Sequence, residues 1–481
     1  VMSEKVINKL LVANRGEISI RIFRAATELK IRTVAVFTHE DRYSLHRYKA
    51  DESYQIGSED NPLKPYLDIE ELISLAKRVG ADAIHPGYGF LSENVSFVRR
   101  CSEEGIIFVG PKAEVMQQLG DKIAAKKIAI KAKVPVIEGA ELKSSNILEI
   151  KEIASKIGYP VMLKAAAGGG GRGMRVVKNE KELERNYSEA KGEAGKAFND
   201  DTIFIEKFID SPKHIEVQIL ADEYGNTVHL FERDCSVQRR FQKVIEVAPC
   251  QNISQETKEK LYSYALAITK SVNYSNAGTV EFLVDKNEGI YFIEVNPRIQ
   301  VEHTITEEIT GIDIVRSQIQ IARGYSLSDP QIHLKSQQDV ACNGFAIQCR
   351  ITTEDPKNNF TPDYGTIIAR RMANGYGIRI DAGSIYTGFK VSPFFDSMLV
   401  KVSAKGRTLK GTCRRMTRAL SEFRVRGVKT NIKFLENVIG HEDFQEGKVT
   451  VNFIENNPEL FEFRKGRDRG GEGIDSSNRS N

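Results

Sequence analysis

Two glutamates, Glu281 and Glu294, have a spacing that predicts a paired carboxylate site. Alternating apolar runs at 277–285 and 290–296 flank a short turn, as in a β-hairpin. A symmetric hairpin over these runs places Glu281 directly opposite Glu294, with Asn296 on the same face. Two carboxylates and an amide oxygen suit Mg²⁺ or Mn²⁺, with nucleotide phosphates completing the shell. The alternative is a slipped register that leaves one glutamate solvated on an exposed face.

The most glycine-rich segment, GGGGRG at 168–173, follows Lys164. It matches the G-x-G-x-x-G of dinucleotide-binding loops, but such a loop opens a helix, whereas MRVV at 174–177 is typical of a strand. The chain contains no Walker A sequence. We therefore expect a β-hairpin whose tip, including Gly170 and Gly171, closes over phosphates while Lys164 supplies a positive charge. The alternative is an exposed flexible loop without a ligand. Together, the loop and the acidic hairpin indicate an ATP site that is not a P-loop.

The elements that must position these residues begin with a β-α-β pattern over the first hundred residues, which predicts a parallel sheet with helices on both faces. A Lys-rich helix is expected at 120–133, then a strand-rich section at 134–205, then a mixed section with hairpins. In the mixed section His214, Glu216 and Gln218 alternate along a predicted strand and so share a face.

The composition describes a globular protein of 481 residues, 41% hydrophobic and 28% charged, long enough for about three domains. No run of eighteen apolar residues predicts a membrane span. A net charge of +4 indicates neither nucleic acid nor a membrane as a partner. Six scattered cysteines without a C-x-x-C pair predict reduced thiols in the cytoplasm, or in the mitochondrial matrix if a transit peptide was removed.

Five longer motifs resemble the ATP-grasp superfamily and, within it, biotin carboxylase, in that family's order from about residue 5 to 460. They are VANRGEI at 12–18, HPGYGFLSEN at 85–94, GGGGRG at 168–173, RDCSVQRR at 233–240 and EVNPRIQVEH at 294–303. The runs NFTPDYG at 359–365 and NPELF at 457–461 are more similar to the biotin carboxylase portion of pyruvate carboxylases than to the acetyl-CoA carboxylase subunit, which stays an alternative.

The resemblance implies a multidomain fold of the α/β and α+β classes, with an ATP-grasp region preceded by a Rossmann-like α/β domain. The expected parts are an N-terminal domain at 1–119, an ATP-grasp region at 120–330 with its lid at about 134–205, a C-terminal domain at 331–460, and a linker or added tail at 461–481. The tail is rich in Gly, Ser and Arg and has too few apolar residues to form a core.

The resemblance also assigns catalytic roles. Glu302 is implied to be the base that deprotonates bicarbonate. Lys243, Arg298, the Gln300 side chain and the Val301 amide are implied to hold the bicarbonate in line with ATP.

Biotin is implied to meet Arg350 and Tyr88. Carboxyphosphate would release CO₂ and phosphate, the phosphate would take the proton from biotin N1′, and Arg350 would stabilise the enolate. The chain has no A-M-K-M biotin attachment motif. We therefore expect biotin to arrive on a carrier domain, with the carboxyltransferase elsewhere, and the resemblance implies a homodimer.

A set of ATP contacts carries over from the family in the same way. They are Lys122, Lys164, Gly170, Gly171, Glu206, Lys207, Phe208, Ile209, His214, Gln238 and Leu283. Phe241 departs from the pattern, because it stands where a nucleotide-binding histidine is common. This departure keeps open a nucleotide-sensing domain without turnover. Another ATP-grasp ligase is a further alternative, which the R-x-Q-V-E-H run and Arg350 disfavour.

Overall fold

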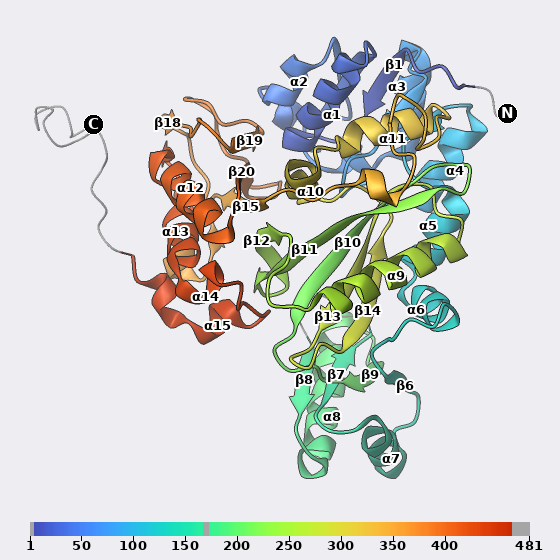
Figure 1. The fold of residues 1–481 in the computed structure, drawn as a ribbon, viewed down its shortest axis with the longest axis vertical. Coiled ribbons are helices and arrows are strands. Elements are labelled where there is room, and N and C mark those ends of the chain that lie inside the picture. Colours follow the sequence, from blue (N-terminus) through green and yellow to red (C-terminus); the bar gives the residue numbers. More distant parts are fainter. Residues whose placement is uncertain (1–3, 167–172, 464–481) are drawn as a thin grey trace, which may run out of the picture.

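The computed structural model describes residues 4–166 and 173–463 of the chain. The molecule consists of an N-terminal α/β unit, a lid, a central antiparallel sheet and a C-terminal part rich in helices (Figure 1). Gly170, Gly171 and residues 464–481 of the predicted tail lie outside the described residues. Within the described ranges, no helix has both the length and the apolar character needed to cross a bilayer.

The N-terminal unit confirms the predicted parallel sheet, with strand order β3-β2-β1-β4-β5. Local signals set its helices: the Asp68 side chain accepts a hydrogen bond from the amide of Glu71 where α3 begins, and Gly80 has a left-handed φ of 71° where α3 ends. The strands are β1 (Lys9–Val12), β2 (Arg32–Phe37), β3 (Glu52–Gln55), β4 (Ala83–His85) and β5 (Ile107–Phe108). The helices are α1 (Gly16–Glu28), α2 (Leu45–Lys49), α3 (Ile69–Val79), α4 (Val95–Glu103) and α5 (Ala113–Gly120).

The lid contains two long helices, so the prediction of a strand-rich section over 134–205 was wrong in part. Four antiparallel strands in the order β6-β9-β7-β8 form its sheet. The signal for α8 was present, because Leu183, Tyr187, Ala190 and Ala194 are buried at helical spacing. After α6 (Lys122–Lys131), the elements are β6 (Gly139–Leu142), α7 (Ile147–Ile157), β7 (Val161–Ala165), β8 (Met174–Val177), α8 (Glu180–Phe198) and β9 (Ile203–Lys207).

The strands on either side of the glycine loop pair as expected. Lys164 on β7 lies opposite Met174 on β8 in an antiparallel ladder. A strand, not a helix, therefore follows the loop, which confirms that this segment is not a dinucleotide-binding turn.

An eight-stranded antiparallel sheet, in the order β14-β13-β10-β11-β12-β15-β20-β19, forms the centre of the molecule (Figure 1). Its strands are β10 (Lys213–Ala221), β11 (Thr227–Arg239), β12 (Gln242–Ala248), β13 (Asn276–Val284), β14 (Ile290–Asn296), β15 (Phe345–Thr352), β19 (Ile378–Ala382) and β20 (Met398–Gly406). The pairing of β12 with β15 makes the sheet continuous across residue 330, with Ile245 opposite Cys349. The predicted boundary at that residue stays a prediction.

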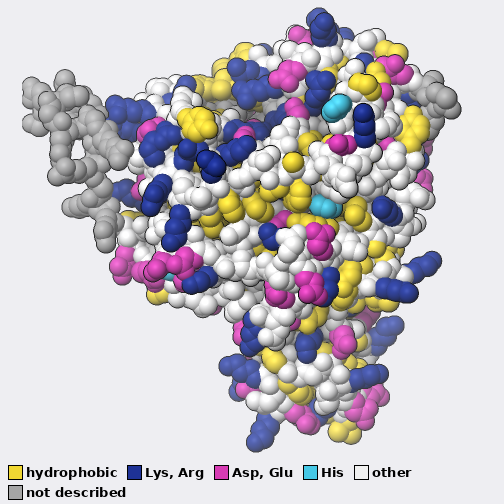
Figure 2. Space-filling view, viewed as in Figure 1, with side chains coloured by type: hydrophobic (Ala, Val, Ile, Leu, Met, Phe, Trp, Pro, Cys, Tyr) yellow, Lys and Arg dark blue, Asp and Glu magenta, His cyan; other side chains and the backbone are white. Residues whose placement is uncertain are grey.

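Helices lie beside this sheet, and further helices form much of the C-terminal part of the molecule (Figure 1). They are α9 (Gln255–Ser271), α10 (His303–Thr310), α11 (Ile314–Ala322), α12 (Leu409–Glu422), α13 (Ile432–Gly440), α14 (Glu442–Gln445) and α15 (Phe453–Asn456). The remaining strands are β16 (Glu354–Asp355), β17 (Thr361–Pro362), β18 (Ala369–Arg371) and β21 (Arg424–Arg426). On the face in Figure 2, basic and acidic side chains are interspersed over most of the surface.

Candidate active site

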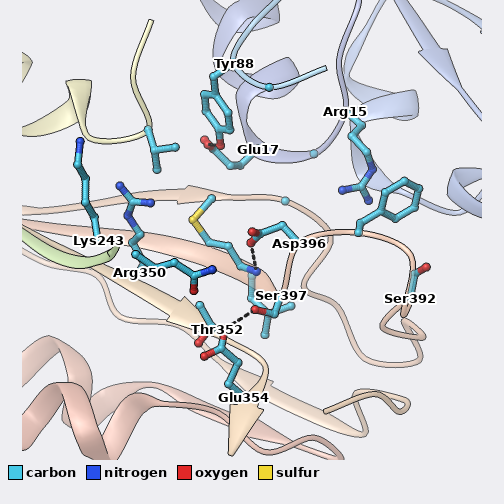
Figure 3. Close-up of a pocket in the computed structure, with 18 of the residues that line it drawn as sticks. Arg15, Glu17, Tyr88, Lys243, Arg350, Thr352, Glu354, Ser392, Asp396 and Ser397 are labelled. Atoms are coloured by element: carbon cyan, nitrogen blue, oxygen red, sulfur yellow. Dashed lines mark hydrogen bonds between the residues drawn. The ribbon is translucent and has the colours of Figure 1, made fainter. Parts of the chain in front are cut away.

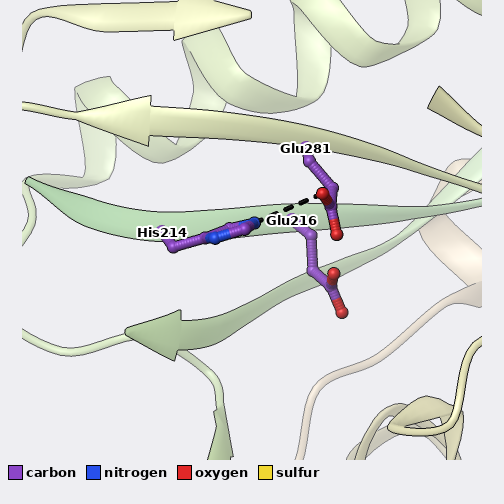
Figure 4. A group of neighbouring side chains, drawn as sticks. All are labelled: His214, Glu216 and Glu281. Atoms are coloured by element: carbon purple, nitrogen blue, oxygen red, sulfur yellow. Dashed lines mark ion pairs between the residues drawn. The ribbon is translucent and has the colours of Figure 1, made fainter. Parts of the chain in front are cut away.

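Neighbouring strands of the central sheet bring three glutamates together. Glu216 on β10 lies opposite Glu281 on β13, and Glu281 lies opposite Glu294 on β14. The predicted pairing of Glu281 with Glu294 is therefore confirmed. His214, on the same face of β10 as Glu216, places its Nε2 3.4 Å from Oε2 of Glu281 (Figure 4).

The hairpin departs from the symmetric register closer to its turn. A β-bulge after Glu281 places Phe282 opposite Phe292, one residue away from the expected partner, Ile293. The Asp285 carboxylate accepts hydrogen bonds from the amides of Asn287, at 2.9 Å, and Gly289, at 2.7 Å. These bonds tighten the turn. The bulge compensates for the tighter turn, so that Glu281 and Glu294 still lie opposite each other.

Lys243 on β12 is the cation that joins the carboxylates. Its Nζ donates to Glu216 at 2.9 Å, to Glu281 at 2.5 Å and to Glu302 at 2.9 Å. Burial lowers the pKa of Lys243, but the three carboxylates outweigh burial and raise this pKa well above its usual value. The ammonium therefore stays charged and holds residues from three elements around one point.

Arg233 on β11 lies beneath this cluster and is fully buried. Its guanidinium donates to Glu216 at 2.6 Å and to Gln218 at 2.8 Å. It also donates to the hydroxyls of Thr306, at 2.8 Å, and Thr279, at 3.2 Å. In the sequence, Arg233 stands out only as part of the RDCSVQRR motif. In the structure, its hydrogen bonds join α10 to three strands of the sheet.

Glu302 and Arg350 form the second half of the cluster. Nη2 of Arg350 on β15 lies 3.0 Å from Glu302, and its Nε donates to the buried Glu246 at 2.7 Å. Burial lowers the pKa of Arg350, but Glu246 and Glu302 raise it above its usual value. Glu246 is a further residue that sequence reasoning missed.

A cavity of about 700 Å³ opens against these groups. Lys243, Glu302, Arg350, Arg298 and Tyr88 all line it. Figure 3 shows Lys243 and Arg350 on one side, with Tyr88 and Glu17 above them. The structure thus brings the predicted catalytic, bicarbonate and biotin residues around one space.

Tyr88, which lines this cavity, contacts a buried ion pair that the sequence did not predict. Its hydroxyl donates to Glu17, which forms an ion pair with Lys401 at 3.1 Å. Lys401 also donates to the carbonyl of Val301 at 2.8 Å. Because Lys401 is fully buried, this chain of contacts anchors the loop that carries Glu302 to the N-terminal unit.

Arg298 lies on the loop between β14 and α10. It donates to the Gln300 side chain at 2.7 Å and to Oδ1 of Asn296 at 3.4 Å, and it pairs with Glu93 at 3.1 Å. The predicted anion-binding side chains Arg298 and Gln300 therefore contact each other, and Arg298 also contacts Asn296, one of the three predicted metal ligands.

The ATP candidates that the structure describes lie on or next to the lid and on the central sheet. On the lid, Lys164 forms an ion pair with Glu206. On the sheet, the amide of Gln238 lies 2.6 Å from Nδ1 of His214. None of the described ATP candidates lines the large cavity. Of the others, Lys122 begins α6, Lys207 ends β9 and lines a second cavity, Phe208 and Ile209 follow β9, and Leu283 lies on β13.

The donor set at Glu281, Glu294 and Asn296 fits a divalent cation. Burial and the adjacent Glu281 raise the pKa of Glu294 to about 7, as expected for two carboxylates forced together. Two other groups have suitable spacing in the described chain, His214 with Glu216 and Glu281, and Glu216 with Cys235 and Glu302. Lys243 bonds to glutamates of both groups. Lys243 bonds to Glu281 of the hairpin trio as well, so this contact does not separate the three groups, and the trio stays a prediction from the sequence.

Replacing Glu294 by Gln tests this trio. We expect the half-saturating Mg²⁺ or Mn²⁺ concentration in ADP formation to rise at least tenfold, because one hard anionic ligand is lost. Without metal, Glu294→Gln should melt at a higher temperature than the wild type above pH 7, because the raised pKa means that ionising Glu294 destabilises the fold. The two melting temperatures should converge as the pH falls below 4.5, the ordinary pKa of a glutamate, where Glu294 is neutral in both the folded and the unfolded chain. Equal melting temperatures above pH 7 would contradict the crowded carboxylate pair.

Comparison with known proteins relates this geometry to described families. The biotin carboxylase N-terminal domain matches residues 6–116, and the biotin carboxylase C-terminal domain matches residues 348–456. The ATP-binding domain of the carbamoyl-phosphate synthase L chain matches residues 121–330. Pyruvate carboxylase from Bacillus subtilis is 55% identical over 469 residues, which are 98% of this chain and 41% of that protein. The chain thus spans about two fifths of the length of such relatives.

Solved structures extend the similarity over whole chains. The biotin carboxylase domain of Hydrogenobacter thermophilus 2-oxoglutarate carboxylase, a dimer with MgADP, ADP and bicarbonate, is 46% identical, with a TM-score of 0.88. The biotin carboxylase subunit of a pyruvate carboxylase is 47% identical, with a TM-score of 0.83. Each alignment covers 96% of this chain and 100% of the other. The chain belongs to the biotin carboxylase family.

Proposed function

We propose that this chain carboxylates biotin with ATP and bicarbonate, as the first half-reaction of a pyruvate carboxylase. One observation carries the proposal: Glu302, a buried carboxylate, is held between Lys243 and Arg350 at the wall of a single cavity. The bicarbonate and MgADP of the Hydrogenobacter domain and the 55% identity to the Bacillus pyruvate carboxylase support it.

The proposed chemistry begins with proton removal from bicarbonate by Glu302. The bicarbonate oxygen then attacks the γ-phosphorus of ATP, which gives carboxyphosphate and ADP. Arg298, Gln300, Lys243 and the Val301 amide would hold the anion in line for this step. The ammonium and guanidinium groups keep the negative charge of the reactants close to the base.

Carboxyphosphate then breaks into CO₂ and phosphate, and the phosphate takes the proton from N1′ of biotin. The enolate that remains attacks CO₂ to give carboxybiotin. Arg350 would donate hydrogen bonds to the enolate oxygen, and Tyr88 would line the biotin side of the cavity. Glu246 also holds the Arg350 guanidinium in place, through the Nε and Nη2 atoms, and Nη2 is the atom that contacts Glu302.

Nucleotide binding is proposed for the lid and the adjoining sheet. Lys122 and Lys164, with Gly170 and Gly171 of the loop, would bind phosphates. Glu281, Glu294 and Asn296 would hold Mg²⁺ or Mn²⁺, which neutralises phosphate charge when bound. The remaining candidates would surround the adenosine, namely Glu206, Lys207, Phe208, Ile209, His214, Gln238 and Leu283.

The partners are proposed from the longer relatives. A biotin carrier and a carboxyltransferase would act on other parts of the same enzyme, and the chain would pair with a second copy, as in the Hydrogenobacter domain dimer. We place it in the cytoplasm or the mitochondrial matrix. Bacterial and human mitochondrial pyruvate carboxylases are both relatives, the latter 52% identical over 465 residues.

The proposed function is tested by ADP formation from ATP, Mg²⁺ and bicarbonate, with and without free biotin. We expect biotin to stimulate the reaction and Arg350→Met to lower the stimulated rate about a hundredfold, because the enolate loses its fixed cation. Arg32→Met, which removes an exposed ion pair with Glu52, is the control. Stimulation by an amine in place of biotin would indicate another ATP-grasp ligase. No ADP at saturating substrates would indicate a nucleotide-binding domain without turnover.

A further inference from the structure

The turn between β11 and β12 has an unusual conformation for its sequence. Arg239 pairs with Gln242, so Arg240 and Phe241 alone form the turn. Both have left-handed backbones, with φ of 48° and 65°. Turns of this kind strongly favour Asn and Gly, and a bulky residue in this region is a marked outlier. Such conformations persist where the surroundings impose them, commonly at ligand sites.

A second left-handed pair in the C-terminal part holds this turn. Asn359 and Phe360 have φ of 54° and 55°. Arg239 donates to the Asn359 side chain at 2.9 Å, and Arg240 donates to the same oxygen at 3.2 Å. The Arg239 guanidinium also lies 4.1 Å from the centre of the Phe360 ring. These contacts fix the position of Phe241, two residues before Lys243.

Phe241 is thereby held in an exposed position on the large cavity. Its side chain is 63% exposed, and it lines the cavity that Lys243, Glu302 and Arg350 also line. Two further exposed apolar side chains line this cavity, Leu63 and Phe394. We call Leu63, Phe241 and Phe394 the apolar rim. The cavity therefore combines a charged wall with an apolar rim, which suits a ligand with a polar head and an apolar body.

We propose that the apolar rim binds the thioether ring and aliphatic chain of biotin while the ureido head meets Arg350, and that Phe241 is a specificity-determining contact. This inference rests on the proposed function. Biotin fits the cavity chemically because its cyclic urea is polar and the rest of the molecule is apolar. Nucleotide phosphates would gain nothing from an exposed phenyl ring, and the described ATP candidates lie off this cavity.

The test compares Phe241→Asn with Phe241→Leu in the full chain, using free biotin as the probe. Asn tolerates a left-handed backbone but offers no apolar surface, whereas Leu keeps the apolar surface. We expect Phe241→Asn to raise the KM for biotin about tenfold and Phe241→Leu to stay within about twofold of the wild type. If Phe241 only shaped the turn, Phe241→Asn would have a KM for biotin equal to that of the wild type or lower.

Three outcomes would overturn the inference. If Phe241→Asn keeps the wild-type KM for biotin, Phe241 makes no apolar contact with biotin. A rise in the KM for ATP, with that for biotin unchanged, would assign Phe241 to the nucleotide. A wild-type chain whose ADP formation ignores biotin would refute the proposed function, and this inference with it. The wild-type assay therefore separates failure of the function from failure of the contact.

Discussion

Replacing Glu302 by Gln is expected to slow biotin-dependent ADP formation about a thousandfold, because general base catalysis contributes factors of this order. The amide keeps the shape of the carboxylate but cannot accept the bicarbonate proton. Steady-state kinetics with saturating ATP, bicarbonate and biotin measure the loss. Binding of MgADP, followed by calorimetry, should persist, since Glu302 bonds to Lys243 and Arg350 and to none of the nucleotide candidates among the described residues.

Glu246→Gln is the matched control for this change. Glu246 is equally buried and bonds to the same arginine, but it does not line the cavity. We expect it to lower the rate by less than about tenfold, through a less firmly held Arg350. Equal losses in the two variants would mean that Glu302 acts only by positioning Arg350, and the assignment of the base would then be wrong.

The largest effect on stability is expected at Arg233. Changing it to Met should lower the free energy of unfolding by about 3 to 5 kcal/mol, because Glu216 would remain buried with one cationic partner removed. Gln218 and two threonine hydroxyls would lose a donor as well. Urea unfolding followed by far-ultraviolet circular dichroism measures the shift of the transition.

Arg32→Met provides the comparison for Arg233. Arg32 also pairs with a glutamate, Glu52 at 2.8 Å, but 58% of its side chain is exposed. Such surface pairs contribute at most about 1 kcal/mol. Similar losses in the two variants would show that the buried network adds nothing beyond a single ion pair.

The sequence predicted the parts of the site that depend on local spacing. Glu281 and Glu294 belong to one hairpin, so alternation alone was enough to place them opposite each other. The same reasoning missed the bulge after Glu281, because the side chain of Asp285 tightens the turn. Alternation likewise put His214 and Glu216 on one face of their strand, and in the structure Glu216 lies opposite Glu281.

The missed residues are those whose partners come from distant segments. Arg233 stands between Glu232 and Asp234, a charge run typical of a solvated surface, and only the assembled sheet and α10 surround it. Lys401 and Glu17 come from opposite ends of the chain and meet only in the fold. The prediction of a strand-rich lid was wrong for a different reason, because the buried residues of α8 recur at helical spacing, a local signal that indicates a helix.

The continuous central sheet has a consequence for synthesis of the protein. β12 ends at Ala248 and its partner β15 begins at Phe345, so roughly 100 residues must be translated before this edge can pair. At common elongation rates this interval is roughly 5 to 20 s. During that time the growing chain exposes an unpaired strand edge, a site prone to pairing with other chains. We therefore expect the nascent protein to need chaperone protection in this interval, which ends once β15 docks and Arg350 reaches Glu246.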